Sequence, residues 1–415
     1  MPIPTPFHPR TSKLCTSYSW KEWAGYHAVC SYDVHHDREY TAFRHSAGLL
    51  DATPLFKYDI TGPDAGRFLS YVTVKDATRI RNGRVVYLCW TDTAGKVLDD
   101  GTLTRWDDHH YRLTSADPSY SWLSRNAHSF DVEVVDVTPT MGTLALQGPR
   151  SRAILDACCD AAPGDTPVQH LKFFGATHAT MAGKRIEVTR TGYTGDLGYE
   201  VWMQSEDALA VWDTLMEAGA PHGITPAGLN ALDVSRVEAG FILGGVDYTS
   251  ARRALIEDQK SSPIEIGLGW TVQLDREPFI GQRHLLQERR TGAKWAIAGL
   301  VIDWEELEEL YDSFGLPPNL PMHAWRESIP LYEGVQQVGY ATSGAWSPTL
   351  KKNLAIATLP QAYAKEGTRL SMEWTVEHRR KTITARVAAR PFFDPERKRS
   401  TPPVPVSASA AATIS

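Results

Sequence analysis

A glycine-rich stretch in the middle of the chain, RTGYTGDLGYEVW at residues 190–202, limits what the chain can fold into. A phosphate-binding loop places such glycines between a strand and a helix, because the helix N-terminus supplies the N–H groups that hold the anion. Here LGYEVWM alternates as a strand does, with Tyr199 and Val201 on one face and Glu200 on the other. The stretch contains neither GxGxxG nor GK[ST], so we predict a wide connection between two strands rather than a phosphate loop.

Glu200, next to aromatic residues, is the most informative side chain of this stretch. A carboxylate beside aromatic rings suits a flat heterocycle with N–H donors, because its two oxygens accept two parallel hydrogen bonds. In the alternative interpretation, Tyr193 and Tyr199 fill a hydrophobic seam and Glu200 is a solvated strand residue. Taken alone, the segment favours this second interpretation.

Length, charge and cysteine content exclude several classes of protein. The 415 residues suffice for two or three domains, and a net charge of −6 with dispersed basic residues excludes nucleic-acid binding. Five cysteines without a CxxC pair fit neither a disulfide framework nor a zinc site, so we expect a reducing compartment, the cytoplasm. The first residues contain no apolar run like that of a leader, and no stretch approaches the length of a membrane span, so we expect neither export nor insertion.

No metal or redox cofactor is expected either. The adjacent histidines at 35–36 and 109–110 lack the spacing of a metal site, and we expect no metal ligands. The chain has no flavin or nicotinamide fingerprint, so any oxidation would require a partner oxidoreductase.

The order of apolar patterns predicts an α+β chain. Residues 1–30 read as irregular and 37–51 as a short helix that stops near Gly48. Residues 83–106 read as two strands joined by a turn at 93–96.

The second half contains one well-marked helix and then mainly strands. ITPAGLNALDVSRVEAG predicts a helix with Thr225 as N-cap and Pro226 at its first position. After about residue 290, short β-like runs predict a small β domain, interrupted by WEELEELYDSFGLPPNLP. The C-terminal stretch is of low complexity and predicts a disordered tail.

Several segments in fixed order resemble one known family. RTGYTGDLGYEVW, GLNALDVSRVEAG, SSPIEIGLGWTVQL, FIGQRHL and TSGAWSPTLKKNLAIA are similar to segments of the aminomethyltransferase family, which includes the glycine-cleavage T-protein. Upstream, AGLLDATPLFKYDITGPDAGRFL, GRVVYLCWTDTAGKVLDDGTL and LALQGP extend the resemblance to most of residues 37–395.

This resemblance implies a fold and a domain division. The fold would be an α+β three-domain cloverleaf of mostly antiparallel sheets, with a small C-terminal β-barrel or jelly-roll-like domain, around a tetrahydrofolate cavity. We expect a discontinuous folate-binding domain at 1–48 and 148–288, an α+β folate-binding domain at 49–147, a β domain at 289–396 and the tail at 397–415.

The resemblance also implies which residue is catalytic. Asp99 and Asp100 are neighbours in a predicted strand, so their side chains point to opposite faces and only one can face a cavity. In the family, the second aspartate of the LDD motif lies beside the reacting nitrogens of folate. Asp100 is therefore the candidate catalytic residue, able to hold or accept a proton.

Four further residues match family positions at the cofactor. By resemblance, Glu200 grips the pterin ring, and Tyr87 and Tyr193 line the same pocket. Arg236 is the arginine that the family helix retains. For Tyr87 a core aromatic is an equally good interpretation.

Two further motifs lead to expectations about single side chains. TSGAWSPTLKKN would place Ser343, Ser347, Lys351 and Lys352 around a turn, where the lysines meet the glutamate tail of folate or form a solvated face. Trp270 is expected in the core.

Departures from the family pattern bear on the one-carbon donor. Leu232 stands where glycine-cleavage members have an arginine, DATPLF lacks the histidine of the family's DVSHM, and WEELEELYDSFGLPPNLP is an insertion. These departures favour transfer of a methyl or aminomethyl group to tetrahydrofolate from a small methylated amine, ether or thioether, as in a demethylase. The donor would lie against Trp20, Trp23 and Tyr26.

Two alternatives stay open. The first is a glycine-cleavage aminomethyltransferase acting on a lipoylated carrier protein. The second is a folate-binding protein without turnover, which the presence of Asp100 disfavours.

Overall fold

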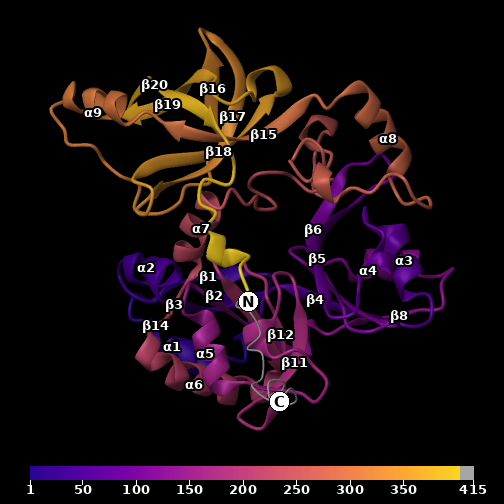
Figure 1. Cartoon of the computed structure of the whole chain (residues 1–415). Helices are drawn as coiled ribbons and strands as arrows, with labels where there is room; N and C mark the ends of the chain where they lie inside the picture. Colours follow the sequence, from indigo (N-terminus) through magenta and orange to yellow (C-terminus); the bar gives the residue numbers. More distant parts are fainter. Residues whose placement is uncertain (402–415) are drawn as a thin grey trace, which may run out of the picture.

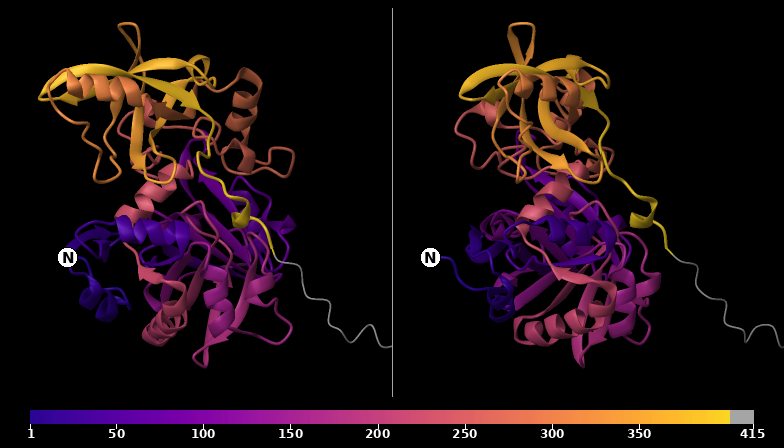
Figure 2. Two further views of the ribbon diagram at one scale, coloured as in Figure 1. Left: turned by 60° about the vertical axis from the view of Figure 1, so that its left-hand side comes forward. Right: turned by 90° about the vertical axis from the view of Figure 1, so that its left-hand side faces the viewer.

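The computed structural model describes residues 1–401 and contains three β-rich units (Figure 1). A closed six-stranded barrel lies at the top of the view, a five-stranded sheet at the right and a seven-stranded sheet at the bottom. Figure 2 shows the barrel above the other two units from two further directions. The α+β class with mostly antiparallel sheets, predicted from the sequence, is confirmed.

The seven-stranded sheet has the order β10-β11-β12-β13-β9-β3-β14. Only the pair β14 and β3 is parallel. The strands are β3 (Ala47–Asp51), β9 (Met141–Gln147), β10 (Asp160–Ala161), β11 (Ala176–Met181), β12 (Lys184–Thr189), β13 (Gly198–Gln204) and β14 (Ile224–Pro226).

The two faces of this sheet differ, as the alternation in β13 predicted. Tyr199 and Val201 are fully buried in a core with Trp212 of α6 (Ala208–Gly219), which packs beside α5 (Ser151–Cys158). Glu200 points to the opposite face, which looks away from these helices. The glycine-rich stretch before β13 connects this strand to β12, so the predicted connection between two strands is confirmed.

The five-stranded sheet has the order β5-β6-β7-β4-β8. The predicted hairpin is present as β5 and β6. The strands and the helices of this unit are β4 (Phe56–Thr61), β5 (Arg84–Thr91), β6 (Val97–Arg105), β7 (His110–Ser115), β8 (Glu133–Asp136), α3 (Ala65–Val72) and α4 (Tyr120–Asn126).

The N-terminal segment is more regular than expected. It forms α1 (His8–Leu14) and a hairpin of β1 (Ser19–Trp23) and β2 (Tyr26–Ser31). The expected helix at 37–51 is shorter: α2 (Asp37–His45) ends before β3, because residues 48–51 pair with β9.

The barrel closes because β15 pairs with both β18 and β20, which leaves no free strand edge. The expected C-terminal β unit is thus a closed barrel. Its elements are β15 (Trp295–Ile302), α9 (Trp304–Asp312), β16 (Ile329–Glu333), β17 (Gln336–Ser347), β18 (Lys352–Pro360), β19 (Arg369–Val376) and β20 (Arg379–Ala388). Helix α9 is the inserted segment; its Leu307 and Tyr311 pack into the barrel core.

Helix α7 (Leu229–Glu238) lies between the barrel and the seven-stranded sheet (Figure 1). The predicted start of this helix was wrong. Thr225 and Pro226 belong to β14, because they pair in parallel with β3, and the helix begins after Gly228. A Cβ on Gly228 would lie 2.4 Å from the carbonyl oxygen of Cys30 in β2, so this close approach requires glycine.

Each unit is tied to both others. The two sheets share a backbone bridge between Arg84 and Gly175. Helix α8 (Gln282–Thr291), which precedes the barrel, packs on the β5–β6 turn at Gly95. After the barrel, the backbone N–H of Phe393 donates to the carbonyl oxygen of Glu238 at 2.8 Å, and Arg397 pairs with Asp196 at 2.7 Å.

Residues 397–401 are packed against the protein, although the sequence predicted that the tail begins at residue 397. Arg190 donates to the carbonyl oxygens of Lys398 and Ser400 and to the Thr401 hydroxyl, so residues 397–401 lie against the seven-stranded sheet. The rest of the expected tail, 402–415, lies outside the described residues.

The domain division stays a prediction, although strand pairing favours a border after Asp51 and another before Met141 in place of 48 and 148. No helix within residues 1–401 is long and apolar enough to cross a membrane.

Candidate functional site

Asp100 lies on β6 between two tyrosine hydroxyls. The hydroxyl of Tyr87 on β5 donates to one carboxylate oxygen and that of Tyr248 donates to the other. Asp99 points the other way, where it accepts from the backbone N–H of Asp117 at 2.8 Å. The two side chains thus point to opposite faces of β6, as strand alternation predicts.

The surroundings of Asp100 favour its protonated form more than water does. Burial raises the pKa of Asp100, and the hydrogen bonds from Tyr248 and Tyr87 offset part of this rise. Burial together with the charge of Asp100 raises the pKa of both tyrosines well above the usual value, so they stay neutral donors. Within residues 1–401 Asp100 has no ion-pair partner. A carboxyl whose pKa is raised by burial takes up a proton more readily than a carboxyl in water does.

A loop after α7, residues 241–248, connects Asp100 to Tyr193, another predicted site residue. The hydroxyl of Tyr193 donates to the carbonyl oxygen of Ile242, and its ring stacks on Phe241 with 5.5 Å between centroids. The same loop carries Tyr248, which reaches Asp100. Burial is the main cause that raises the pKa of Tyr193, and the charge of Asp100 adds to it.

Arg236 of α7 is the centre of a buried ionic network. Its Nη1 donates to Asp247 at 2.7 Å and to the Ser343 hydroxyl at 3.0 Å, and its Nε donates to Asp233 at 2.7 Å. Asp247 also accepts from Thr342 and from the backbone N–H of Leu243. The network therefore fixes the 241–248 loop between α7 and the barrel strand β17.

One atom of this network is unsatisfied. Nη2 of Arg236 is buried and has no hydrogen-bond partner among the residues that the structure describes. A buried guanidinium N–H without a partner is costly, so a polar group of a ligand would be stabilised there.

Glu200 is held on one side only. Its Oε2 accepts from the hydroxyls of Thr191 at 2.6 Å and Thr189 at 3.4 Å, while Oε1 receives no hydrogen bond from residues 1–401. Burial raises the pKa of Glu200, and the two threonines and the charge of Lys57 oppose this rise. Thr191 belongs to the same glycine-rich loop as Tyr193, so this loop connects Glu200 to the rest of the site.

Trp270 was expected in the core, and this was wrong. Its side chain is 67% exposed in a 3-10 turn (Gly269–Thr271) and stacks on Tyr87, with 6.1 Å between ring centroids. Trp270 therefore forms an open aromatic wall next to the residue that binds Asp100.

The TSGAWSPTLKKN motif divides into buried and exposed parts. Ser343 and Ser347 are not turn residues; they are buried in β17, where Ser347 donates to Glu238 at 2.5 Å. Lys351 and Lys352 are exposed at the turn between β17 and β18.

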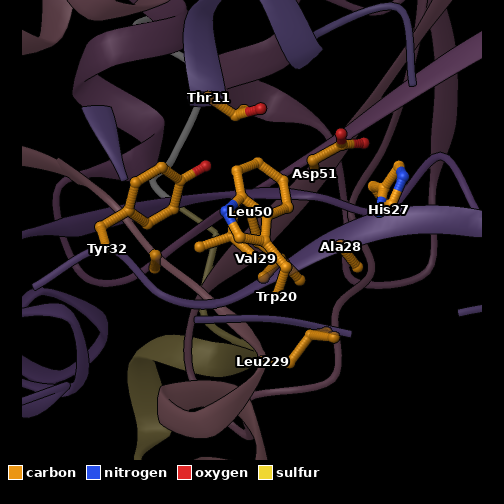
Figure 3. Close-up of a pocket in the computed structure, with 10 residues that line it drawn as sticks. Thr11, Trp20, His27, Ala28, Val29, Tyr32, Leu50, Asp51 and Leu229 are labelled. Atoms are coloured by element: carbon orange, nitrogen blue, oxygen red, sulfur yellow. The ribbon is translucent and has the colours of Figure 1, made fainter. Parts of the chain in front are cut away.

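The one-carbon donor was expected to lie against the N-terminal hairpin. The structure has a small cavity there, between the hairpin and β3. Trp20 lines it, with Tyr32 and His27 on opposite sides of the indole (Figure 3). The cavity volume is about 10 Å³, enough for roughly one water molecule and too small for a donor. Trp23 and Tyr26 are not among its lining residues; Trp23 packs near Leu229 and Leu232.

A larger open pocket of about 410 Å³ lies at the joint of the two sheets, away from the predicted residues. Arg84, Trp106 and His178 line it, and the Trp106 and His178 rings lie 4.6 Å apart. No group of three or more metal-ligating side chains converges within residues 1–401.

Sequence reasoning missed Asp247 and Tyr248, although both hold the residues that it found. GGVDYTS, where they occur, has no periodicity or motif that indicates a site. Their roles depend on contacts with β6 and α7, which are distant in sequence.

Comparisons with known proteins agree with the fold. The model of the GCVT N-terminal domain family matches residues 10–276, and the glycine cleavage T-protein C-terminal barrel domain matches residues 315–394. An aminomethyltransferase of Bacillus pumilus is 33% identical over 363 residues, 86% of this chain and 89% of that protein. One of Halalkalibacterium halodurans is 32% identical over 361 residues, 86% of this chain and 89% of that protein.

A solved structure shows the same architecture. The crystal structure of glycine cleavage system aminomethyltransferase T from Bartonella henselae superimposes with a TM-score of 0.79 at 25% identity, covering 95% of this chain and 99% of that chain.

Proposed function

Because the chain belongs to the aminomethyltransferase (glycine-cleavage T-protein) family and is a transferase, we propose that it moves a one-carbon unit onto tetrahydrofolate at Asp100. The observation that carries this proposal is the setting of Asp100: a partly buried carboxyl that accepts hydrogen bonds from two neutral hydroxyls and pairs with no cation within residues 1–401. Such a group changes its protonation state at low cost, which an acid or base must do in each turnover.

The residues present fit a reduced folate. Oε1 of Glu200 is free to accept hydrogen bonds from the amino-pyrimidine edge of a pterin, and Nη2 of Arg236 is free to donate one. Tyr87, Tyr193 and Trp270 offer aromatic faces for a flat ring. This fit supports the proposed roles of these side chains in cofactor binding.

The chemistry requires one proton transfer that Asp100 can perform. When a folate nitrogen attacks the one-carbon unit, a nitrogen–carbon bond forms, the bond between that carbon and the donor's heteroatom breaks, and the nitrogen loses a proton. Asp100 accepts this proton and the leaving group takes one up. Tyr87 and Tyr248 keep the carboxylate oriented, since each binds one of its oxygens.

The family relationship makes an aminomethyl group on a lipoylated carrier protein the first donor to test. In this transfer two folate nitrogens each form a bond to the carbon and each lose a proton, while the carbon–sulfur and carbon–nitrogen bonds of the aminomethyl group break. The two protons leave with the dithiol of the carrier and with ammonia, and methylene-tetrahydrofolate remains. A carrier protein is thus a proposed partner.

One observation favours a second candidate, a small free methylated donor. Leu232 stands where glycine-cleavage members have an arginine, and its side chain packs against the cluster that contains Ala28 of the hairpin, so an apolar side chain replaces a cation at this position of α7. Transfer of a methyl group from an ether or thioether would give methyl-tetrahydrofolate and the demethylated donor, with no oxidant required.

The enzyme is proposed to act in the cytoplasm, where its five free cysteines would stay reduced.

The test combines binding and turnover. Titration calorimetry of tetrahydrofolate into the whole chain should show binding, and Asp100→Asn should bind about as well while turnover falls roughly 10²-fold or more. Turnover is measured with an aminomethylated carrier and with a panel of methyl ethers, thioethers and amines. Unchanged turnover in Asp100→Asn would remove Asp100 from the mechanism, and absent folate binding would overturn the proposed function.

A further inference from the structure

Arg326, from the segment between α9 and β16, contacts α7 directly beside Leu232. Its Nε donates to Oδ2 of Asp233 at 2.8 Å, and its side chain is 37% exposed. Asp233 already binds Arg236 through its other oxygen. One carboxylate is therefore shared by two guanidinium groups, and the Nη atoms of Arg326 have no partner among residues 1–401.

The position of Arg326 is built into the barrel. The neighbouring Trp325 exchanges two backbone hydrogen bonds with Gly344 of β17, at 2.8 and 3.0 Å. A Cβ on Gly344 would lie 2.2 Å from the Trp325 ring, so the glycine of the TSGAWSP motif makes room for this indole. The segment is thus fixed to the barrel at the residue before Arg326.

A second cation, Lys21, approaches the same place from the N-terminal hairpin. Lys21 lies opposite Ala28 in the register of β1 and β2, and Ala28 packs with Leu229 and next to Leu232. Burial lowers the pKa of Lys21, the charge of Arg326 lowers it further, and Asp233 opposes the change. In the described part of the chain, the Lys21 ammonium has no hydrogen-bond or ion-pair partner.

The charges at this place do not balance. Arg236 is neutralised by Asp247, and Asp233 is shared between Arg236 and Arg326, which leaves the positive charge of Lys21 uncompensated. Because Asp233 is already shared by Arg236 and Arg326, it cannot also balance Lys21, and an anion is the complementary ligand.

We propose that Lys21 and Arg326 together bind a carboxylate of a ligand in the site, carried either by the one-carbon donor or by the glutamate tail of the folate. This inference rests on the proposed function for the identity of the ligand, but not for the existence of the anion site. Trp23 and Leu232 both pack against the apolar cluster that contains Ala28, the residue opposite Lys21, so the carboxylate would be attached to an apolar or aromatic body.

The proposal also accounts for the loss of the family arginine at position 232. In glycine-cleavage members one arginine of the helix supplies the positive charge. Here Arg326, from the segment before β16, and Lys21, from the hairpin, would supply it instead. The positive charge is thus supplied by two segments more than 300 residues apart in the chain, at positions 21 and 326.

The test uses matched pairs of ligands with and without a carboxylate. Tetrahydrofolate is compared with 6,7-dimethyltetrahydropterin, which lacks the tail, and benzoate is compared with benzamide, each titrated calorimetrically into the whole chain. The variants are Arg326→Ala, Arg326→Lys and Lys21→Ala, with Arg290→Ala on the exposed face of α8 as the matched control.

We expect Arg326→Ala and Lys21→Ala to weaken one carboxylate ligand about 10- to 100-fold, with its uncharged counterpart unchanged. Arg326→Lys should retain part of that affinity, because the charge remains. A loss confined to benzoate assigns the carboxylate to the donor, and a loss confined to tetrahydrofolate assigns it to the folate tail.

Unchanged affinity for both carboxylates in Arg326→Ala, or wild-type protein that binds neither more tightly than its uncharged counterpart, would overturn the proposal. If the wild type fails to bind tetrahydrofolate, the proposed function fails, while benzoate and benzamide still decide on the anion site. Thermal unfolding of each variant identifies a loss that is due to misfolding.

Discussion

Two aspartates, Asp100 and Asp247, are stabilised in opposite ways. Asp247 pairs with the Arg236 guanidinium and accepts further hydrogen bonds from Thr342 and Ser343. Asp100 accepts hydrogen bonds from Tyr87 and Tyr248 and has no cation within the described residues. Only the first of the two carboxylates is paired with a cation.

The difference in hydrogen-bond partners suits Asp247 to a structural role and Asp100 to proton transfer. An ion-paired carboxylate with all its oxygens satisfied holds two elements in place, and taking up a proton would break that contact. A carboxylate held only by neutral hydroxyls keeps its position in either protonation state, since the hydroxyls can rotate. The loop 241–248 joins the two by carrying Asp247 and Tyr248 as neighbours.

The sharpest test of this contrast is to neutralise each aspartate in turn and measure stability. Asp247→Asn should lower the free energy of unfolding by about 3–5 kcal/mol, because it leaves a buried guanidinium without its charged partner. Asp100→Asn should change it by less than about 1 kcal/mol at neutral pH, since no cation loses a partner. Denaturant unfolding gives both values, and equal losses would contradict the contrast.

The pH dependence of stability sharpens the same comparison. Because the pKa of Asp100 is raised on folding, its carboxyl contributes stability below the unfolded pKa and loses it as pH rises through the folded pKa. Wild-type protein should therefore lose stability relative to Asp100→Asn as pH rises from about 4 toward neutrality.

Glu200 lies between these two extremes, with one oxygen held and one free. Glu200→Ala should weaken tetrahydrofolate binding by about 1.5–3 kcal/mol in calorimetric titration, the range of hydrogen bonds to a charged group. Glu206→Ala, an exposed acid just after the same strand, is the matched control. Equal affinity in Glu200→Ala and wild type would make Glu200 a structural residue.

The smallest expected effect concerns the tyrosines. The Tyr248 hydroxyl stabilises the ionised form of Asp100, so Tyr248→Phe should raise the pKa of Asp100 further and move the acidic limb of the kcat/KM profile up by about one pH unit. Tyr363→Phe, which removes a hydroxyl bound to Glu333 on the barrel surface, is the control. An unmoved limb would show that Asp100 does not govern it.

Local patterns were enough to predict the faces of single strands. Glu200 and Asp100 point where alternation placed them, since the period of a strand is a property of the backbone. The start of α7 was missed because the pairing of Thr225 with Gly48 in β3, a long-range contact, outweighed the local helix signal.

The parts of the site that no local pattern shows depend on contacts between units. Tyr248 and Arg326 lie in irregular segments, and only the packing of the barrel on α7 and of β6 on the 241–248 loop brings them to Asp100 and Asp233. Trp270 was misjudged because a large aromatic is usually buried, whereas here it stacks on Tyr87 at the surface.

The ties between the three units have a mechanical consequence. The barrel is fastened before its first strand, through α8 at Gly95, and again after its last strand, through Phe393 and Arg397, while the two sheets share the bridge at Arg84. Three bodies joined in a ring cannot swing apart on a single hinge. Any widening of one joint must be matched by displacement at the other two, so access to the centre is a concerted motion of the whole molecule.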